Sequence, residues 1–272
     1  MPSMSKEIGY LVSDGARLHY TVDGRGPPIV LLHCLPMDRR VWMHQTFDLA
    51  ADHSTIALDF PGLGLSEKLA GPSSIETRTV HVRNLLDHLE IARSIVMGIS
   101  IGAAVAQQFA VSFPERTEAL VLSGSGCSSM NDAVQNKFTG RIAGYSSKDS
   151  EAYYETHLRS LFSDYFLSTP LAAAIISNYM SVSKRVDFPS IALLFQALKK
   201  FDLEREIAKV RVPTLVISGE KDRAFHDSKK ICGLIPGSRF VGIPNAGHAV
   251  CIETPLQFNH ELRAFLANAA RK

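Results

Sequence analysis

The stretch Ile95-Val96-Met97-Gly98-Ile99-Ser100-Ile101-Gly102-Ala103-Ala104-Val105-Ala106 decides the fold, because two kinds of local structure meet in it. It begins as an apolar run typical of a buried strand and ends as an alanine-rich helix. Between them, residues 98–102 have the pattern G-x-S-x-G, which carries a nucleophilic serine when it joins a strand to a helix. The pattern also arises by chance in loops, so its meaning depends on whether a base and an acid follow at other strand ends.

Composition and charge narrow the class of protein. The chain has 272 residues, 46% of them hydrophobic, which suits one large α/β domain or two small ones. Its 29 basic and 27 acidic residues give a formal charge of +2, so no nucleic-acid partner is expected. The first residues lack the apolar core of a signal peptide, and no run is long enough to cross a membrane. We therefore expect a cytoplasmic protein with no membrane partner.

The four cysteines show no C-x-x-C spacing; they are Cys34, Cys127, Cys232 and Cys251. In a cytoplasmic chain this favours free thiols over disulfides or metal ligands. No metal site and no cofactor are predicted, and no motif sets the oligomeric state.

Short apolar runs alternate with helical patterns along most of the chain. Strands are expected at residues 8–12, 17–22, 29–33, 55–59, 94–98, 119–123, 213–219 and 239–243, the first two paired as an antiparallel hairpin. Helices are expected at residues 41–51, from a capping box of Ser73 and Glu76 to about Leu89, and at 101–113, 227–234 and 254–269. This alternation predicts an α/β fold with a mostly parallel sheet and helices on both faces.

The alternation stops between residues 125 and 206, where helices are expected at 133–141, 150–162, 170–182 and 189–199. Six aromatic residues there look exposed: Tyr153, Tyr154, Phe162, Tyr165, Phe166 and Tyr179. The segment is either a second helical domain with its own core or a lid over the carboxyl edge of the sheet. Because the strand pattern resumes afterwards, we favour a helical lid of residues 125–206, inserted after the sixth strand into a core of residues 1–124 and 207–272.

Three polar residues follow expected strands in the chain order Ser100, Asp222 and His248. Sites of parallel α/β sheets form beyond the carboxyl ends of the strands, so these side chains are expected to meet. A serine hydroxyl needs a base to take its proton, and histidine titrates near neutral pH. A buried carboxylate would orient that histidine and stabilise its protonated form. The sequence therefore predicts a catalytic triad of Ser100, Asp222 and His248.

The chain resembles serine hydrolases of the α/β-hydrolase fold, in the branch of small esterases, enol-lactonases and cofactor-free haloperoxidases. Besides the G-x-S-x-G turn, the resemblance rests on five stretches: His33-Cys34-Leu35-Pro36 with Trp42, residues 59–66, residues 113–116, residues 218–222 and residues 245–248. It implies an oxyanion hole formed by the backbone N–H groups of Ile101 and Leu35. Cys34 stands where the family usually has glycine, so a positive φ there would strain the loop.

We expect Cys34, Ile99, Tyr165 and Phe166 to line the substrate pocket, although Cys34 also fits a small buried hydrophobic position. The leading interpretation is hydrolysis of a small to medium, mainly hydrophobic carboxylic ester or lactone through an acyl-enzyme on Ser100. A carbon–carbon bond hydrolase or a perhydrolase of the same fold is an alternative. A protein of another class, a sensor that binds a small ligand and keeps the triad, is also compatible with the sequence, because fold alone does not fix function.

Overall fold

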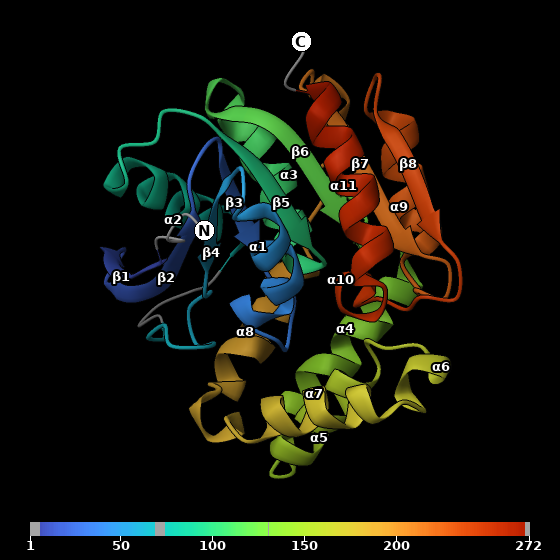
Figure 1. The fold of residues 1–272 in the computed structure, drawn as a ribbon. Coiled ribbons are helices and arrows are strands. Elements are labelled where there is room, and N and C mark those ends of the chain that lie inside the picture. The colour runs from blue at the N-terminus through green and yellow to red at the C-terminus, as the bar shows by residue number, and fades with distance from the viewer. Residues whose placement is uncertain (1–5, 69–73, 130, 270–272) are drawn as a thin grey trace.

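The structure is a computed structural model that describes residues 6–68, 74–129 and 131–269. Within these residues, eight strands form one sheet in the order β1-β2-β4-β3-β5-β6-β7-β8 (Figure 1). Strand β2 pairs antiparallel with β1 and β4, and all the other pairs are parallel. The strands are β1 Lys6–Ser13, β2 Ala16–Gly24, β3 Pro28–Leu32, β4 Ser54–Leu58, β5 Ser94–Ile99, β6 Thr117–Ser123, β7 Thr214–Gly219 and β8 Arg239–Ile243. The predicted fold class is confirmed.

Both faces of the sheet are buried, because successive side chains of a strand point to opposite faces. In β3, Val30 and Leu32 belong to one apolar cluster, and Ile29 and Leu31 belong to the other. The first cluster includes side chains of α2 (Ile75–His88), α3 (Ile101–Ser112) and α9 (Phe225–Leu234). The second includes side chains of α1 (Met43–Leu49), α10 (Val250–Glu253) and α11 (Pro255–Ala269).

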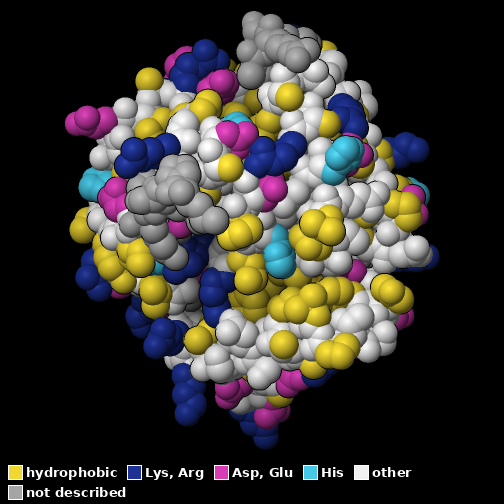
Figure 2. All heavy atoms as spheres, viewed as in Figure 1, with side chains coloured by type: hydrophobic (Ala, Val, Ile, Leu, Met, Phe, Trp, Pro, Cys, Tyr) yellow, Lys and Arg dark blue, Asp and Glu magenta, His cyan; other side chains and the backbone are white. Residues whose placement is uncertain are grey.

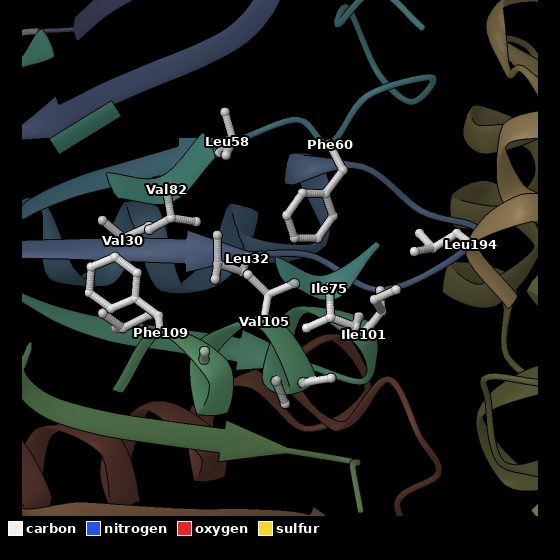
Figure 3. Packing of buried hydrophobic residues seen from close by; sticks show 14 of the residues in the cluster. Val30, Leu32, Leu58, Phe60, Ile75, Val82, Ile101, Val105, Phe109 and Leu194 are labelled. Carbon is white, nitrogen blue, oxygen red and sulfur yellow. The ribbon is translucent and has the colours of Figure 1, made fainter. Parts of the chain in front are cut away.

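Figure 3 shows the first cluster from close by, with Val30 and Leu32 facing Val82 of α2 and Val105 and Phe109 of α3. All five side chains are fully buried. Fully burying an aliphatic or aromatic side chain contributes about 1.5–3 kcal/mol, so this layer holds α2 and α3 firmly on the sheet. The residue that follows β5, Ser100, is thereby held at the start of a fixed helix.

Five helices lie together at one end of the sheet in Figure 1. They are α4 Asp132–Tyr145, α5 Ser150–Arg159, α6 Asp164–Leu167, α7 Pro170–Met180 and α8 Phe188–Leu198. Their buried side chains join both clusters of the sheet: Tyr154 and Leu194 belong to the first, and Leu158 and Tyr179 to the second. The helical segment and the sheet therefore share their apolar cores.

The expectation that all six aromatic residues of this segment are exposed is wrong. Tyr154, Phe162, Phe166 and Tyr179 are buried, whereas Tyr165 is 77% exposed. The sequence pattern could not reveal this, because which face of each helix is covered depends on how the helices pack against the sheet.

Several element boundaries also differ from expectation, and one short helix was not expected. Ser73 of the predicted capping box lies outside the described residues, and the observed N-cap of α2 is Ser74, whose hydroxyl accepts a hydrogen bond from the N–H of Thr77. The predicted C-terminal helix starts at Pro255, after the separate short helix α10, since proline fits the first turn of a helix. The four-residue helix α6 is too short to leave a periodic pattern.

Candidate active site

Ser100 lies on the sharp turn between β5 and α3, with φ 56° and ψ −117°. Non-glycine residues seldom adopt positive φ, and such strain gathers at functional sites. The flanking glycines are required by space: a Cβ on Gly98 would lie 2.2 Å from the carbonyl oxygen of Gly102, and one on Gly102 would lie 2.1 Å from that of Leu32. The Ser100 N–H donates to the carbonyl of Ser123 at 2.8 Å, which fixes the turn against β6.

Asp222 and His248 form a hydrogen-bonded pair. His248 Nδ1 lies 2.9 Å from Oδ2 of Asp222, and the N–H of Ala224 donates to Oδ1 at 2.9 Å. Burial by itself raises the pKa of Asp222, but the attraction and hydrogen bond of His248 outweigh it and hold the pKa below its usual value. Asp222 is therefore an ionised carboxylate at neutral pH, placed to fix the orientation of the imidazole.

Ser100, Asp222 and His248 line one cavity of about 1180 Å³. No hydrogen bond joins the Ser100 hydroxyl to His248 in the described part of the chain. Among the described residues, His248 forms a hydrogen bond through Nδ1 alone, which leaves its Nε2 available. Catalytic hydrogen bonds are often long before substrate binds, so the arrangement is compatible with proton transfer from Ser100 to Nε2.

Two backbone N–H groups at the cavity also have free hydrogen-bonding capacity. Leu35 and Ile101 both line the cavity, and neither N–H donates to another residue within the described ranges. Ile101 is the first residue of α3, whose N-terminal end carries partial positive charge. Unused donors of this kind stabilise negative charge that develops on an oxygen beside them.

The loop that carries Leu35 is held by His33. This imidazole accepts a hydrogen bond from the N–H of Phe60 at its Nε2 (2.9 Å), and its Nδ1 donates to the carbonyl of Cys34 (3.0 Å). Burial lowers the pKa of His33, in keeping with this neutral form. Cys34 does not have a positive φ, so the backbone strain that cysteine would cause in place of glycine does not arise at this position.

Two of the four predicted pocket residues line the cavity, Tyr165 and Phe166. Cys34 and Ile99 do not. Both are fully buried in the second apolar cluster, because their side chains point into the core behind the cavity wall. Burial also raises the pKa of the Cys34 thiol to about 12, which keeps it in the unreactive protonated form.

Figure 2 shows the side of the molecule on which hydrophobic side chains gather around a histidine, with Lys or Arg side chains beside them. The apolar part of the cavity wall comes largely from the helical segment and includes Phe138, Leu161, Phe162, Phe195 and Leu198. The segment 125–206 thus supplies much of the surface that a bound molecule would contact.

Sequence reasoning missed Glu253, a carboxylate on α10 that joins two parts of the site. Its Oε1 accepts hydrogen bonds from the N–H groups of Gly247 and Ser163, both at 3.0 Å, and its Oε2 accepts one from the Ser163 hydroxyl at 2.6 Å. Gly247 precedes His248, and Ser163 belongs to the helical segment. Nothing in the sequence pattern marks this role, because the three residues meet only in the folded chain.

It also missed a set of basic residues on the cavity wall, which includes Lys137 and Arg141 of α4 and Arg223 after Asp222. The spacing of Lys137 and Arg141 could have indicated that both side chains lie on one face of α4, since residues four apart on a helix are neighbours.

Among the residues that the structure describes, no group of three or more His, Cys, Asp or Glu side chains is placed to hold a metal ion. No helix formed by them has the length and apolar character needed to span a membrane.

Comparison with known proteins shows the family. The alpha/beta hydrolase fold family matches residues 27–255. The dihydrolipoyllysine-residue acetyltransferase component of the acetoin cleaving system of Pseudomonas putida is 30% identical over 246 residues, which are 89% of this chain and 64% of that longer protein. The pimeloyl-[acyl-carrier protein] methyl ester esterase of Pectobacterium carotovorum subsp. carotovorum is 29% identical over 92% of this chain and 98% of its own length.

The fold also matches that of a solved structure over nearly the whole chain. The enol-lactonase from Burkholderia xenovorans superimposes with a TM-score of 0.88 at 27% identity, covering 95% of this chain and 100% of that one. The family match spans most of the chain and agrees with the sheet order and the turn at Ser100. The chain therefore belongs to the alpha/beta hydrolase fold family.

Proposed function

We propose that this chain is a serine hydrolase that cleaves a small to medium, mainly hydrophobic carboxylic ester or lactone through an acyl-enzyme on Ser100. The observation that carries the proposal is that all the groups needed for acyl transfer line one cavity. The hydrogen-bonded Asp222–His248 pair, the serine at its strained turn and two unused N–H donors all line it. Each group has the chemistry that one step of acyl transfer requires.

In the proposed reaction, the Ser100 oxygen attacks the substrate carbonyl carbon while Nε2 of His248 takes the hydroxyl proton. The negative charge that forms on the carbonyl oxygen is stabilised by the N–H groups of Ile101 and Leu35, of which one such donor contributes about 3 kcal/mol. His248 then gives its proton to the leaving alkoxide, and the acyl group remains on Ser100. A water molecule, deprotonated by His248, attacks the acyl-enzyme and releases the acid.

Asp222 serves this cycle without itself taking a proton. Its carboxylate accepts a hydrogen bond from Nδ1 of His248, which directs the other ring nitrogen to the reaction. The lowered pKa of Asp222 keeps the carboxylate charged when the imidazolium forms beside it.

The cavity supports an acyl substrate with an apolar part. Its aromatic and aliphatic wall suits a hydrocarbon chain, and its volume of about 1180 Å³ exceeds the needs of a very small ester. We propose that residues 125–206 act as a lid that determines which hydrocarbon part of the substrate can bind. The esterase and enol-lactonase named above are similar proteins whose names refer to reactions of this class, which supports the proposal.

Active-site labelling followed by turnover measurement tests the proposal. A fluorophosphonate probe should label one residue, and peptide mass spectrometry should locate the label on Ser100. The wild-type protein should then cleave p-nitrophenyl esters or simple lactones over many cycles, and Ser100→Ala should abolish both labelling and cleavage. Labelling of another residue would contradict the assigned nucleophile, and stoichiometric ligand binding without turnover would favour a sensor.

A further inference from the structure

Four cationic side chains of the cavity wall form no ion pair with any residue in the described ranges: Lys137, Arg141, Lys221 and Arg223. Of these, Lys137, Arg141 and Arg223 lie close enough together to repel one another. Arg141 donates to the Ser160 hydroxyl at 3.1 Å and also interacts with the Tyr153 side chain, and the guanidinium has further N–H groups for a bound anion. Lys137 and Arg141 lie four residues apart on α4, where like charges destabilise a helix.

Electrostatic repulsion acts among these three side chains. Lys137 is accessible from the cavity, but the protein around it lowers its pKa, first by desolvation and then by repulsion from Arg141 and Arg223, which together outweigh the attraction of Asp222 and Asp227. Desolvation is also the first cause of the lowered pKa of Arg141, to which Arg223 adds repulsion. A bound anion would relieve both effects, because an opposite charge close by favours the charged form of each side chain.

Some of the other charged groups of the cavity are already paired or hydrogen-bonded to neighbouring residues. Asp222 is paired with His248, and Glu253 accepts three hydrogen bonds from Ser163 and Gly247. Arg159 is paired with Glu155. Asp164, Lys221 and Asp227 complete the set of charged residues on the cavity wall.

We propose that Lys137, Arg141 and Arg223 form a subsite for a free carboxylate of the substrate. The preferred substrate is then an ester or lactone whose acyl chain ends in a second, unesterified carboxyl group. This inference rests on the proposed function and names its substrate class. A guanidinium matches a carboxylate with two parallel hydrogen bonds, and the apolar wall accommodates the chain between the two ends of such a molecule.

A monovalent carboxylate fits this site better than a phosphate. Asp164, Asp227 and Glu253 line the same cavity and would repel a dianion more strongly than a monoanion. Because Arg223 directly follows Asp222 in the chain, the subsite lies on the side of the cavity where the acid of the proposed triad is found.

A pair of matched substrates tests the subsite. Mono-p-nitrophenyl adipate carries a free carboxylate, and its methyl ester carries none, while the reacting ester is the same. The wild-type protein should prefer the free acid in kcat/KM by about tenfold or more. Lys137→Gln and Arg141→Gln should each reduce this preference about tenfold, as expected for the loss of one charge-assisted hydrogen bond. Lys137→Arg should retain it.

Lys148→Gln is the matched control, because it removes the same charge from an exposed position between α4 and α5, outside the cavity. It should leave the preference unchanged. A wild-type protein that prefers the neutral ester, or a preference that survives both glutamine variants, overturns the subsite. In that case labelling of Ser100 and cleavage of the neutral ester would still uphold the proposed function.

A binding measurement separates the two ideas further. Calorimetry with Ser100→Ala needs no turnover, so it reports on the subsite even when the proposed reaction is wrong. Monomethyl adipate, which carries one carboxylate, should bind to this variant, and a second change, Lys137→Gln, should weaken that binding about tenfold. Tighter binding of inorganic phosphate than of monomethyl adipate would overturn the assignment to a carboxylate.

Discussion

Replacing Gly124 by alanine tests whether the geometry of the His248–Asp222 pair controls turnover. Gly124 follows β6 with φ 56°, and a Cβ built on it would lie 2.9 Å from Oδ2 of Asp222 and from Nδ1 and Cε1 of His248. Such contacts are shorter than real Cβ atoms make, so Gly124→Ala must push the pair aside.

The size of the effect follows from these distances. Ordinary contact begins at 3.4 Å, so the pair must move by about 0.5 Å. Since a misplacement of about 1 Å costs about 100-fold in rate, we expect kcat to fall roughly 10- to 100-fold. The left-handed backbone costs alanine about 1–2 kcal/mol, which lowers Tm by about 2–8 °C.

Gly126→Ala is the matched control, two residues further along the same loop. A Cβ there would have its closest contact with Cβ of Asp227 at 3.3 Å, and Gly126 has no positive φ. Steady-state kinetics on a p-nitrophenyl ester gives kcat, and circular dichroism during heating gives Tm. A Gly124→Ala variant that turns over as fast as the wild type, or a Gly126→Ala variant that loses as much activity, would show that the position of the His248–Asp222 pair does not limit turnover.

Three further predictions concern the same site. His248→Ala should reduce kcat by about 10⁴-fold or more with an unchanged circular dichroism spectrum, and a folded variant with near-normal kcat would rule out its role as the base. Glu253→Gln should lower both kcat and Tm, because each hydrogen bond to a partly buried carboxylate contributes about 1.5–3 kcal/mol and these bonds hold Gly247 beside His248; an unaltered Tm would contradict this. The pKa of Asp222 is lowered on folding, so its contribution to stability is complete above about pH 4 and is lost as the pH falls through the folded-state value. Urea unfolding of Asp222→Asn should therefore show a weaker loss of stability in acid than the wild type, and an equal or steeper loss would be the contrary result.

The sheet and the residues at its strand ends could be predicted because they depend on local features of the chain. The apolar run before Ser100 predicts a buried strand, and the glycines on either side of Ser100 predict the sharp turn that follows it. The positions of Asp222 and His248 follow from the rule that the carboxyl ends of parallel strands meet at one edge. Each strand, turn and strand-end residue can be recognised from a short stretch of neighbouring sequence.

Side-chain direction could not be predicted in the same way. Cys34 and Ile99 adjoin the predicted site residues Leu35 and Ser100, yet both point into the core, since the pleat and the path of the loop decide which side faces the cavity. The hydrogen bonds of Glu253 depend on three segments that are far apart in the sequence.

The shared apolar cores of the sheet and the helical segment have a consequence for how selectivity can change. Tyr179 and Leu194 of that segment are buried in clusters that also contain β3, so removing residues 125–206 would expose part of both apolar clusters to solvent. Such a deletion would destabilise the sheet as well as change the cavity wall. New specificities are therefore accessible through single replacements on the cavity wall, where a side chain can change size or charge while the layers beneath it stay intact.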